Sequence, residues 1–236
     1  MKVVISSGAG VSAESGMMTY RDAGGLWDNY PVMEVASDEG FAKNPKLIHQ
    51  FYSNLRTKMA ANVKPNAAHL ALAELEKYHD VRIITQNVDD LHERAGSTNV
   101  LHLHGELMKV RSMRHPERVY TLPCDELSDK GLTTTVDTVD PYGDHVRPHI
   151  VFFGESVPNF EPACHMVEDA DVVIVIGTSL VVYPAAALLQ YAPQSAKVYY
   201  VDPRPAKVPS WVNVIAEPAT VGVTRLVEEL KQMASK

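Results

Sequence analysis

The sequence predicts an α/β fold, a doubly wound parallel sheet with a second, smaller lobe formed by insertions. Three observations carry this prediction. Short runs rich in β-branched residues recur along the 236 residues, helical patterns separate them, and a glycine-rich turn directly follows the first run. This alternation of strand and helix, opened by such a turn, is typical of Rossmann-like sheets.

The predicted strands are apolar on both faces, as expected for a parallel sheet that helices cover. They span residues 3–5, 81–85, 99–103, 172–176, 197–201 and 212–215. A helix is predicted over 65–75, where Asn66 is a suitable N-cap. Another is predicted over 221–233, where Leu226, Leu230 and Met233 form one apolar stripe.

Two segments break this alternation. Residues 22–59 are aromatic-rich and predicted helical, and residues 106–149 carry turn formers and charges with little periodicity. We therefore expect one domain over residues 1–236, with two lobes. The Rossmann-like lobe would comprise about 1–21, 60–105 and 150–236, and the small lobe about 22–59 and 106–149. A substrate is expected between the small lobe and the carboxyl ends of the strands.

Charge and composition exclude several classes of protein. A formal net charge of -7 argues against a nucleic-acid-binding surface. The apolar stretch at residues 3–5 is too short for a signal peptide, and Gly177 and Pro184 interrupt the apolar segment 171–189, which suits a buried strand and helix better than a membrane span. The two cysteines, Cys124 and Cys164, lie far apart, as in proteins of a reducing compartment. We predict a cytoplasmic protein with neither nucleic-acid nor membrane partners.

The glycine-rich turn at residues 8–16 reads Gly-Ala-Gly-Val-Ser-Ala-Glu-Ser-Gly. Glycines let the backbone approach a pyrophosphate, and the helix that this turn should open offers amide donors to it. The spacing departs from G-x-G-x-x-G because the third glycine comes late. Tight packing between strand and helix would also explain the turn.

Four further segments follow in an order that makes the chain resemble the sirtuin family. Residues 8–21 resemble its GAGxSxxSGIPxFR signature, and the other matches are Gln86-Asn87-Val88-Asp89 to QNxD, Leu103-His104-Gly105 to the HG element, Phe153-Gly154-Glu155 to FGE and Gly177-Thr178-Ser179 to GTS. The match covers nearly the whole chain, and residues 65–69 and 91–96 resemble the short bacterial members. The resemblance implies an NAD-dependent protein lysine deacylase that yields nicotinamide, free lysine and O-acyl-ADP-ribose.

The resemblance also implies which residues bind NAD and substrate. The pyrophosphate would be lined by Gly8, Ala9 and Gly10, with Ala13 packed close to the cofactor and Arg21 closing the site on a phosphate. The nicotinamide and its ribose would be surrounded by Gln86, Asn87 and Asp89, and further phosphate and ribose contacts would come from Gly177, Thr178 and Ser179. A strand carrying Val151, Phe153, Gly154 and Glu155 would pair with an extended substrate peptide whose lysine is acylated.

The resemblance assigns catalysis to His104 as general base, together with Asn87. In sirtuins the acyl oxygen attacks the ribose carbon that nicotinamide leaves, and the base takes a proton from a ribose hydroxyl. A histidine, with an unperturbed pKa of about 6.5, suits this work at neutral pH and contributes roughly 10²-fold to 10⁴-fold. The residues alone leave alternatives open, since His102 and His104 share a strand face and such a pair is also found in structural or metal sites. Likewise, Asn87 and Asp89 are common turn residues.

The chain departs from most sirtuins where two cysteine pairs would hold a structural zinc. Cys124 is the only cysteine between residues 105 and 153, and Ser112 stands where the first zinc cysteine is expected. We therefore expect no structural zinc, and a small lobe held by packing of Val119, Tyr120, Leu122 and Tyr142.

A second departure is Asp202, at the end of a strand where many sirtuins have Asn. A carboxylate there can accept from both hydroxyls of the adenosine ribose and repels a 2′-phosphate, which favours NAD over NADP.

The acyl preference rests on one helix. In sirtuins that prefer succinyl-lysine or malonyl-lysine, a Tyr and an Arg three residues later bind the acidic acyl end. Tyr52 matches the Tyr, but Leu55 is third and Arg56 fourth. Because positions three and four residues on share a helix face, we predict that succinyl-lysine is processed, besides acetyl-lysine, through Tyr52 and Arg56. A solvated Arg56 on an amphipathic helix is the alternative.

Three other functions compete with deacylation. A mono-ADP-ribosyltransferase cleaves the same cofactor but delivers ADP-ribose to a protein side chain. A catalytically silent NAD-binding sensor would bind without turnover, although both His104 and Asn87 are present. A nicotinamide-dependent oxidoreductase is disfavoured by the glycine spacing.

Overall fold

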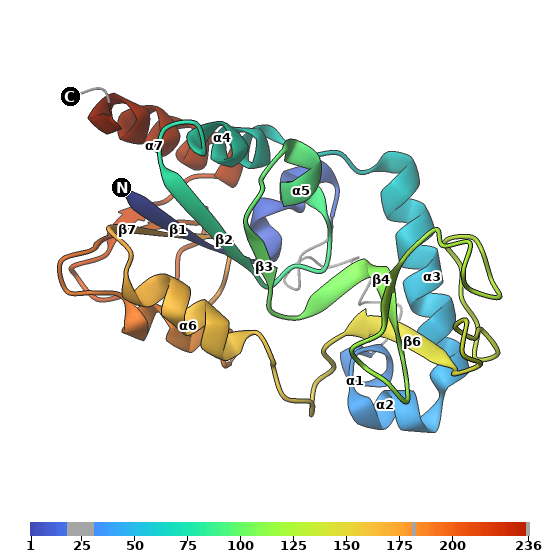
Figure 1. The fold of residues 1–236 in the computed structure, drawn as a ribbon. Coiled ribbons are helices and arrows are strands. Elements are labelled where there is room, and N and C mark those ends of the chain that lie inside the picture. Colours follow the sequence, from blue (N-terminus) through green and yellow to red (C-terminus); the bar gives the residue numbers. More distant parts are fainter. Residues whose placement is uncertain (18–30, 181–182, 235–236) are drawn as a thin grey trace.

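A computed structural model describes residues 1–17, 31–180 and 183–234. Its centre is a six-stranded sheet in the order β3-β2-β1-β7-β8-β9 (Figure 1). The strands are β1 (Lys2–Ser7), β2 (Asp80–Thr85), β3 (Val100–His102), β7 (Val172–Ile176), β8 (Lys197–Val201) and β9 (Asn213–Ile215). All neighbours pair in parallel, and each strand overlaps a predicted run, although β1 extends beyond the predicted 3–5 at both ends. Because the strand order reverses between β1 and β7, the predicted doubly wound α/β fold is confirmed.

Helices cover both faces of this sheet (Figure 1). On one face, α4 (Ala67–Leu75) and α7 (Ala219–Ala234) pack together over Val3, Ile5 and Ile174. On the other face, α6 (Phe160–Glu168) and the 3₁₀ helix η4 (Ala185–Tyr191) pack over Val4 and Val173. Both predicted helices are present, and Asn66 caps α4 through its side chain, which accepts from Ala68 N at 2.9 Å.

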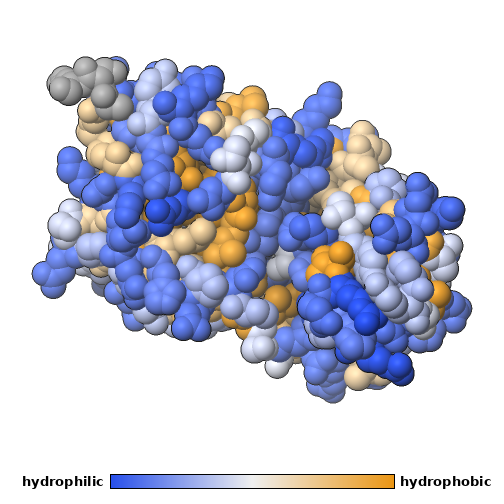
Figure 2. All heavy atoms as spheres, viewed as in Figure 1, coloured by the Kyte–Doolittle hydropathy of each residue, from blue (hydrophilic) through white to orange (hydrophobic). Residues whose placement is uncertain are grey.

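A smaller lobe is built from the segments that break the alternation. It contains α1 (Val32–Val35), α2 (Asp38–Lys43), α3 (Pro45–Asn62) and an antiparallel sheet β5-β4-β6 of β4 (Gly105–Ser112), β5 (Val119–Thr121) and β6 (Val146–Ile150). Hereafter the small lobe means these elements, and the large lobe means the six-stranded sheet with its covering helices. Figure 2 shows hydrophilic side chains over most of this face, with apolar patches on both lobes.

Only two residues connect strand β3 of the large sheet to strand β4 of the small sheet, since β3 ends at His102 and β4 begins at Gly105. Gly105 has φ +84°, and a Cβ on it would lie 2.1 Å from His149 O. A side chain at this position would both strain the backbone and collide with β6. The glycine of the HG pair therefore lets the chain turn sharply beside His104.

The core of the small lobe differs from the prediction. Leu122 is buried against Val110, and Tyr120 packs on the same cluster. Val119 is 39% exposed and Tyr142 is 73% exposed, so the prediction that these two are core residues is wrong. Both lie outside the apolar cluster of Val110, Leu122, Leu127 and Val146 that forms the core of this region.

Asp140 is a buried carboxylate in this region. Its carboxylate accepts from Tyr142 N and Asp144 N, both at 3.0 Å, and from Tyr120 Oη at 3.2 Å. Arg118 approaches the same carboxylate at 3.7 Å, and its guanidinium lies 4.1 Å from the centre of the Tyr142 ring. The exposed tyrosine is thus held by a cation–π contact rather than by burial.

Within the described ranges, the helices are all too short or too polar to cross a membrane.

Candidate active site

The residues at the carboxyl ends of β1, β2 and β7 open onto a cavity of about 680 Å³ that extends to the small lobe. This is the edge at which ligands bind in doubly wound sheets. Nearly all the predicted site residues line it: Gly8, Ala9, Gly10, Ala13, Tyr52, Gln86, Asn87, Asp89, His104, Val151, Phe153, Gly154, Glu155, Gly177, Thr178, Ser179 and Asp202. Arg21 lies outside the described residues.

The floor of the cavity is the contact between the turns that follow β1 and β7. Gly8 N donates to Ile176 O at 2.9 Å, and Gly10 N donates to Gly177 O at 2.8 Å. A Cβ on Gly10 would lie 2.5 Å from Gly177 Cα, so neither turn could carry a side chain here. The helix predicted after the turn is limited to two 3₁₀ turns, η1 (Ala9–Val11) and η2 (Ala13–Ser15). The glycines therefore let the two turns pack directly against each other, and backbone of both turns forms the floor of the cavity.

His104 lies beside this floor, and its environment fixes its chemistry. Its Nδ1 is 3.0 Å from Gln86 O. Because a carbonyl can only accept, Nδ1 carries the hydrogen and Nε2 keeps the lone pair. Burial lowers the pKa of His104, and the bond to the Gln86 carbonyl opposes this only in part. The ring is therefore neutral at pH 7 and able to accept a proton.

Ser12 connects the glycine turn to the polar residues after β2. Its hydroxyl donates to Asp89 Oδ2 and accepts from Asn87 Nδ2, both at 3.1 Å. Burial raises the pKa of the Asp89 carboxyl to about 6, although bonds from Leu91 N and Ser12 oppose the shift. Ser12 was not assigned a role from the sequence, although it belongs to the quoted signature.

The far end of the cavity carries Asp202, which is buried at the end of β8. Its Oδ1 accepts from Arg204 N at 2.8 Å, which fixes the carboxylate at the rim. On the floor between the two ends, Gln86 Nε2 donates to Thr178 Oγ1 at 3.3 Å. The cavity therefore has one acidic end and one end at His104.

The wall next to His104 is apolar. Tyr52, Leu55 and Met59 of α3 line it together with Ile150 and Phe152, and all five belong to or pack on one hydrophobic cluster of the small lobe. Among the described residues, Lys58 and Arg204 are the positively charged side chains that line the cavity. Lys58 is exposed on α3, whereas Arg204 lies at the Asp202 end.

Arg56 does not line this wall, so its predicted role at the acyl end needs correction. It is fully buried on the far side of α3. Its Nε donates to Leu107 O at 2.7 Å, and its Nη1 donates to Leu132 O and Thr134 Oγ1 at 3.3 Å. One residue of helix advances the side chain by about 100°, and this rotation gives the cavity to Leu55 instead.

The segment 151–155 is not the strand that we predicted. β6 ends at Ile150, and Phe153 makes only an isolated bridge to Ser37. Both backbone groups of Phe153 are engaged, because its N donates to Ala36 O and its O accepts from Asp38 N. Glu155 forms an ion pair with Arg147 at 2.6 Å, so its carboxylate holds the segment in place.

Comparisons with known proteins agree with this geometry. The model of the Sir2 family matches residues 8–184. The chain belongs to the Sir2 family. A protein of Bacteroides thetaiotaomicron named NAD-dependent protein deacylase is 49% identical over 233 residues, which cover 98% of this chain and 97% of that protein. A protein of the same name from Helicobacter pylori strain J99 is 49% identical over 237 residues, covering 99% and 97%.

Solved Sir2 structures show the same fold. A mutant Sir2 homologue in complex with ADP ribose has a TM-score of 0.87 and 37% identity, and the alignment covers 99% of this chain and 93% of that one. A Sir2 bound to acetylated peptide has a TM-score of 0.79 and 30% identity, covering 96% and 92%.

In this Sir2 chain, the region of the expected zinc holds no arrangement of three or more His, Cys, Asp or Glu suited to a metal, as far as the described residues extend. Ser112 is fully buried, and its hydroxyl accepts from His115 N at 3.1 Å. Cys124 packs on the apolar cluster around Val110. The absence of zinc stays a prediction.

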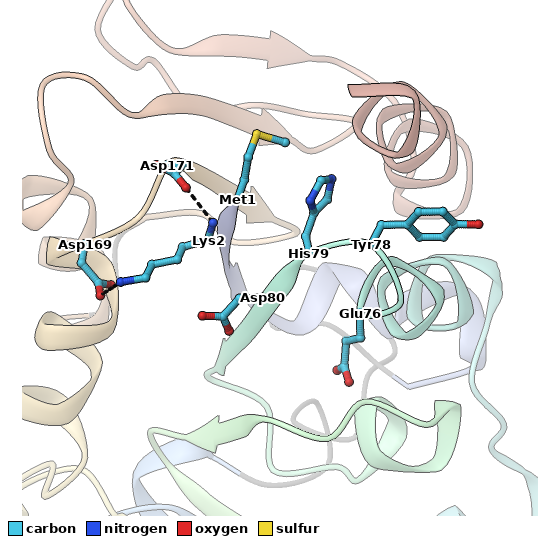
Figure 3. Close-up of a pocket in the computed structure, with 8 residues that line it drawn as sticks. All are labelled: Met1, Lys2, Glu76, Tyr78, His79, Asp80, Asp169 and Asp171. Carbon is cyan, nitrogen blue, oxygen red and sulfur yellow. Dashed lines mark hydrogen bonds and ion pairs between the residues drawn. The ribbon is translucent and has the colours of Figure 1, made fainter. Parts of the chain in front are cut away.

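A second hollow lies at the amino ends of β1 and β2, where Lys2, Glu76, His79, Asp80, Asp169 and Asp171 are among the lining residues (Figure 3). Asp169 forms an ion pair with Lys2, and Asp171 accepts from Lys2 N at 2.7 Å. This hollow is on the opposite edge of the sheet from His104, so it is separate from the active site of this Sir2 chain.

Proposed function

We propose that this chain is an NAD-dependent protein lysine deacylase, with His104 as the general base. The observation that carries the proposal is the fixed tautomer of His104, whose Nδ1 is bound to Gln86 O beside a cavity floored by glycines. The names of the relatives and the ADP-ribose and acetyl-peptide complexes of similar structures support the same conclusion. The substrates are acylated-lysine proteins, and the products are nicotinamide, free lysine and O-acyl-ADP-ribose.

The residues of the cavity fit NAD. Gly8, Ala9, Gly10 and Gly177 would line the pyrophosphate, because Gly10 and Gly177 let the turns after β1 and β7 meet at the cavity floor without side chains between them. Asp202 would accept from the adenosine ribose, and Asn87 and Asp89, held by Ser12, would face the nicotinamide end. When bound, NAD supplies an electrophilic ribose carbon as its nicotinamide leaves.

His104 contributes by accepting a proton at Nε2. Burial keeps the ring neutral, and the bond at Nδ1 strengthens as the ring becomes charged, since Gln86 O then faces a full imidazolium. This arrangement costs little in reorganisation when the proton moves.

The test is to incubate the pure protein with NAD and a panel of acyl-lysine peptides and to weigh the products. We expect deacylated peptide, nicotinamide and O-acyl-ADP-ribose, and no deacylated peptide from His104→Ala, which should still bind NAD because the base adds little ground-state affinity. Transfer of labelled ADP-ribose to protein without deacylation would identify a mono-ADP-ribosyltransferase. Binding of NAD without turnover would identify a sensor, and reduction of NAD would identify an oxidoreductase.

The apolar wall favours neutral acyl groups. Tyr52, Leu55 and Met59 offer an acyl chain hydrocarbon surface, and burying a succinyl carboxylate against it is costly because Lys58, the cation that α3 brings to the cavity, is exposed to solvent. We expect acetyl-lysine to be used with a much higher kcat/KM than succinyl-lysine. Leu55→Arg places a guanidinium on this wall and should raise desuccinylation by roughly tenfold to a hundredfold, the value of one charge-assisted bond. Wild-type desuccinylation as fast as deacetylation would refute this assignment.

We also propose a cytoplasmic location, since Cys124 and Cys164 are both free thiols, as is usual in a reducing compartment.

A further inference from the structure

The side chains of two histidines bind the backbone carbonyls that follow β2. The last paired residues of β2 and β3 are Thr85 and His102, and Leu103 N donates to Thr85 O at 2.9 Å. The next two carbonyls after Thr85 accept from histidine side chains instead of from backbone amides. Gln86 O is 3.0 Å from His104 Nδ1, and Asn87 O is 3.0 Å from His102 Nδ1.

His102 has a second partner that His104 lacks. Its Nε2 is 2.7 Å from Oε1 of Glu93 on α5 (Leu91–Ala95). Asn87 O can only accept, and an ionised carboxylate can only accept, so both ring nitrogens of His102 must carry hydrogen. The ring is 7% exposed, and its backbone is held as well, because Asn159 Nδ2 donates to His102 O at 2.8 Å.

We propose that His102, held as an imidazolium by Glu93, is a positioning residue that fixes the turn at Gln86 and Asn87 and so orients the base His104. The inference rests on the proposed deacylase function. His102 would affect catalysis in two ways. By binding the Asn87 carbonyl it keeps the Asn87 side chain hydrogen-bonded to Ser12. It also holds the adjoining Gln86 carbonyl in place, and this carbonyl sets the tautomer of His104. A shift of about 1 Å in such a turn can cost a hundredfold in rate.

The charges around His102 agree with this state. Burial lowers the pKa of His102, but the Glu93 carboxylate, the Asn87 carbonyl and Glu106 raise it more, so the net shift is upward. Burial raises the pKa of Glu93, and the bond from His102 reverses that shift. The other titratable groups that interact with His102 are Asp89 and His92. Above the raised pKa, His102 keeps one N–H for two acceptors, and the charged carboxylate attracts it more strongly than the carbonyl does.

Two substitutions of His102 separate positioning from packing. His102→Leu removes both donors, whereas His102→Asn keeps an amide nitrogen near the place of Nδ1, facing Asn87 O. Both lose the Glu93 partner, so a loss of stability from the broken ion pair is common to both. We expect kcat for deacetylation to fall by roughly 10- to 100-fold in His102→Leu, with NAD affinity changed less than about threefold, and to recover at least partly in His102→Asn.

The pH profile of a third variant tests the charge. In the wild type, activity should fall at high pH as His102 loses its proton. In Glu93→Gln the amide can donate to Nε2 of a neutral ring, which keeps the Nδ1 hydrogen on Asn87 O, so this fall should disappear while activity at pH 7 is largely kept. Nitrogen NMR of the imidazoles, assigned by the signal missing in His102→Asn, should show two protonated nitrogens for His102 at pH 7.

The outcomes are distinct. Equal kcat in His102→Leu and His102→Asn, an unchanged basic limb in Glu93→Gln, or a neutral His102 ring at pH 7 would each overturn the positioning role. A wild-type protein inert toward every acyl-lysine peptide would instead refute the proposed deacylase function, and the NMR measurement of His102 stands apart from activity.

Discussion

Replacing Arg56 by Met separates a structural role of this arginine from a role in acyl recognition. Arg56 ties α3 to β4 through Leu107 O and to the loop through Leu132 O and Thr134. Losing a hydrogen bond to a charged group costs about 1.5–3 kcal/mol. The substitution loses three such bonds, but it also removes the free-energy cost of keeping a charged guanidinium buried. Burial lowers the pKa of Arg56 from 12.5 to about 10, which corresponds to about 3 kcal/mol.

The balance leaves Arg56→Met destabilised by about 1.5–6 kcal/mol. A chain of this size loses about 2–4 °C of melting temperature per kcal/mol, so calorimetry should show a fall of roughly 3–24 °C. The ratio of kcat/KM for acetyl and succinyl peptides should stay as in the wild type. Lys46→Met is the matched control, because it removes an exposed cation of the same helix that does not line the cavity and should change the free energy of unfolding by less than about 0.5 kcal/mol. An unchanged melting temperature with selective loss of desuccinylation in Arg56→Met would show that this reasoning is wrong.

Three further results are expected. Elemental analysis should find no stoichiometric zinc, and a strong chelator should leave the melting temperature unchanged; one equivalent of zinc would contradict the reading of Ser112. Burial lowers the pKa of both His49 and His69 from 6.5 to about 4, so the stability that their neutral rings provide is complete above pH 6.5 and is lost as the pH falls toward 4. Each histidine accounts for about 3 kcal/mol of this loss. The free energy of unfolding, measured with urea, should therefore depend less on pH between 6.5 and 4 in His69→Gln than in the wild type. An equal pH dependence in the two proteins would show that His69 is already charged in the folded state. Asp202→Asn removes a like charge from the site of a 2′-phosphate and should raise kcat/KM with NADP by at least about tenfold relative to NAD, whereas an unchanged ratio would place the adenosine ribose elsewhere.

The sheet and the cofactor cavity could be predicted from the sequence because each is encoded locally. A β-branched run such as residues 172–176 is apolar on both faces and suits only a covered strand, and the turns after β1 and β7 meet wherever parallel strands are neighbours. All of the predicted residues that are described, apart from Arg56, line the one cavity, and all of these except Tyr52 of α3 lie in segments that follow a strand.

What the sequence did not reveal depends on angles and on distant partners. Leu55 and Arg56 differ by one helical step, and the acceptors that draw Arg56 away, at residues 107, 132 and 134, lie more than fifty residues along the chain. The same holds for Tyr142, which is exposed and whose ring lies against the guanidinium of Arg118, twenty-four residues earlier in the chain. The local sequence of one segment does not identify the distant residues with which its side chains will pair.

The two-residue joint between the sheets gives His104 two attachments of different kinds. Its ring is bound to Gln86, at the end of a large-lobe strand, while its backbone carbonyl accepts from Val151 N at 3.0 Å, directly after the small-lobe strand β6. His104 is therefore attached to both lobes at the point where they join, so a change in the angle between the lobes would act on the position of the base itself.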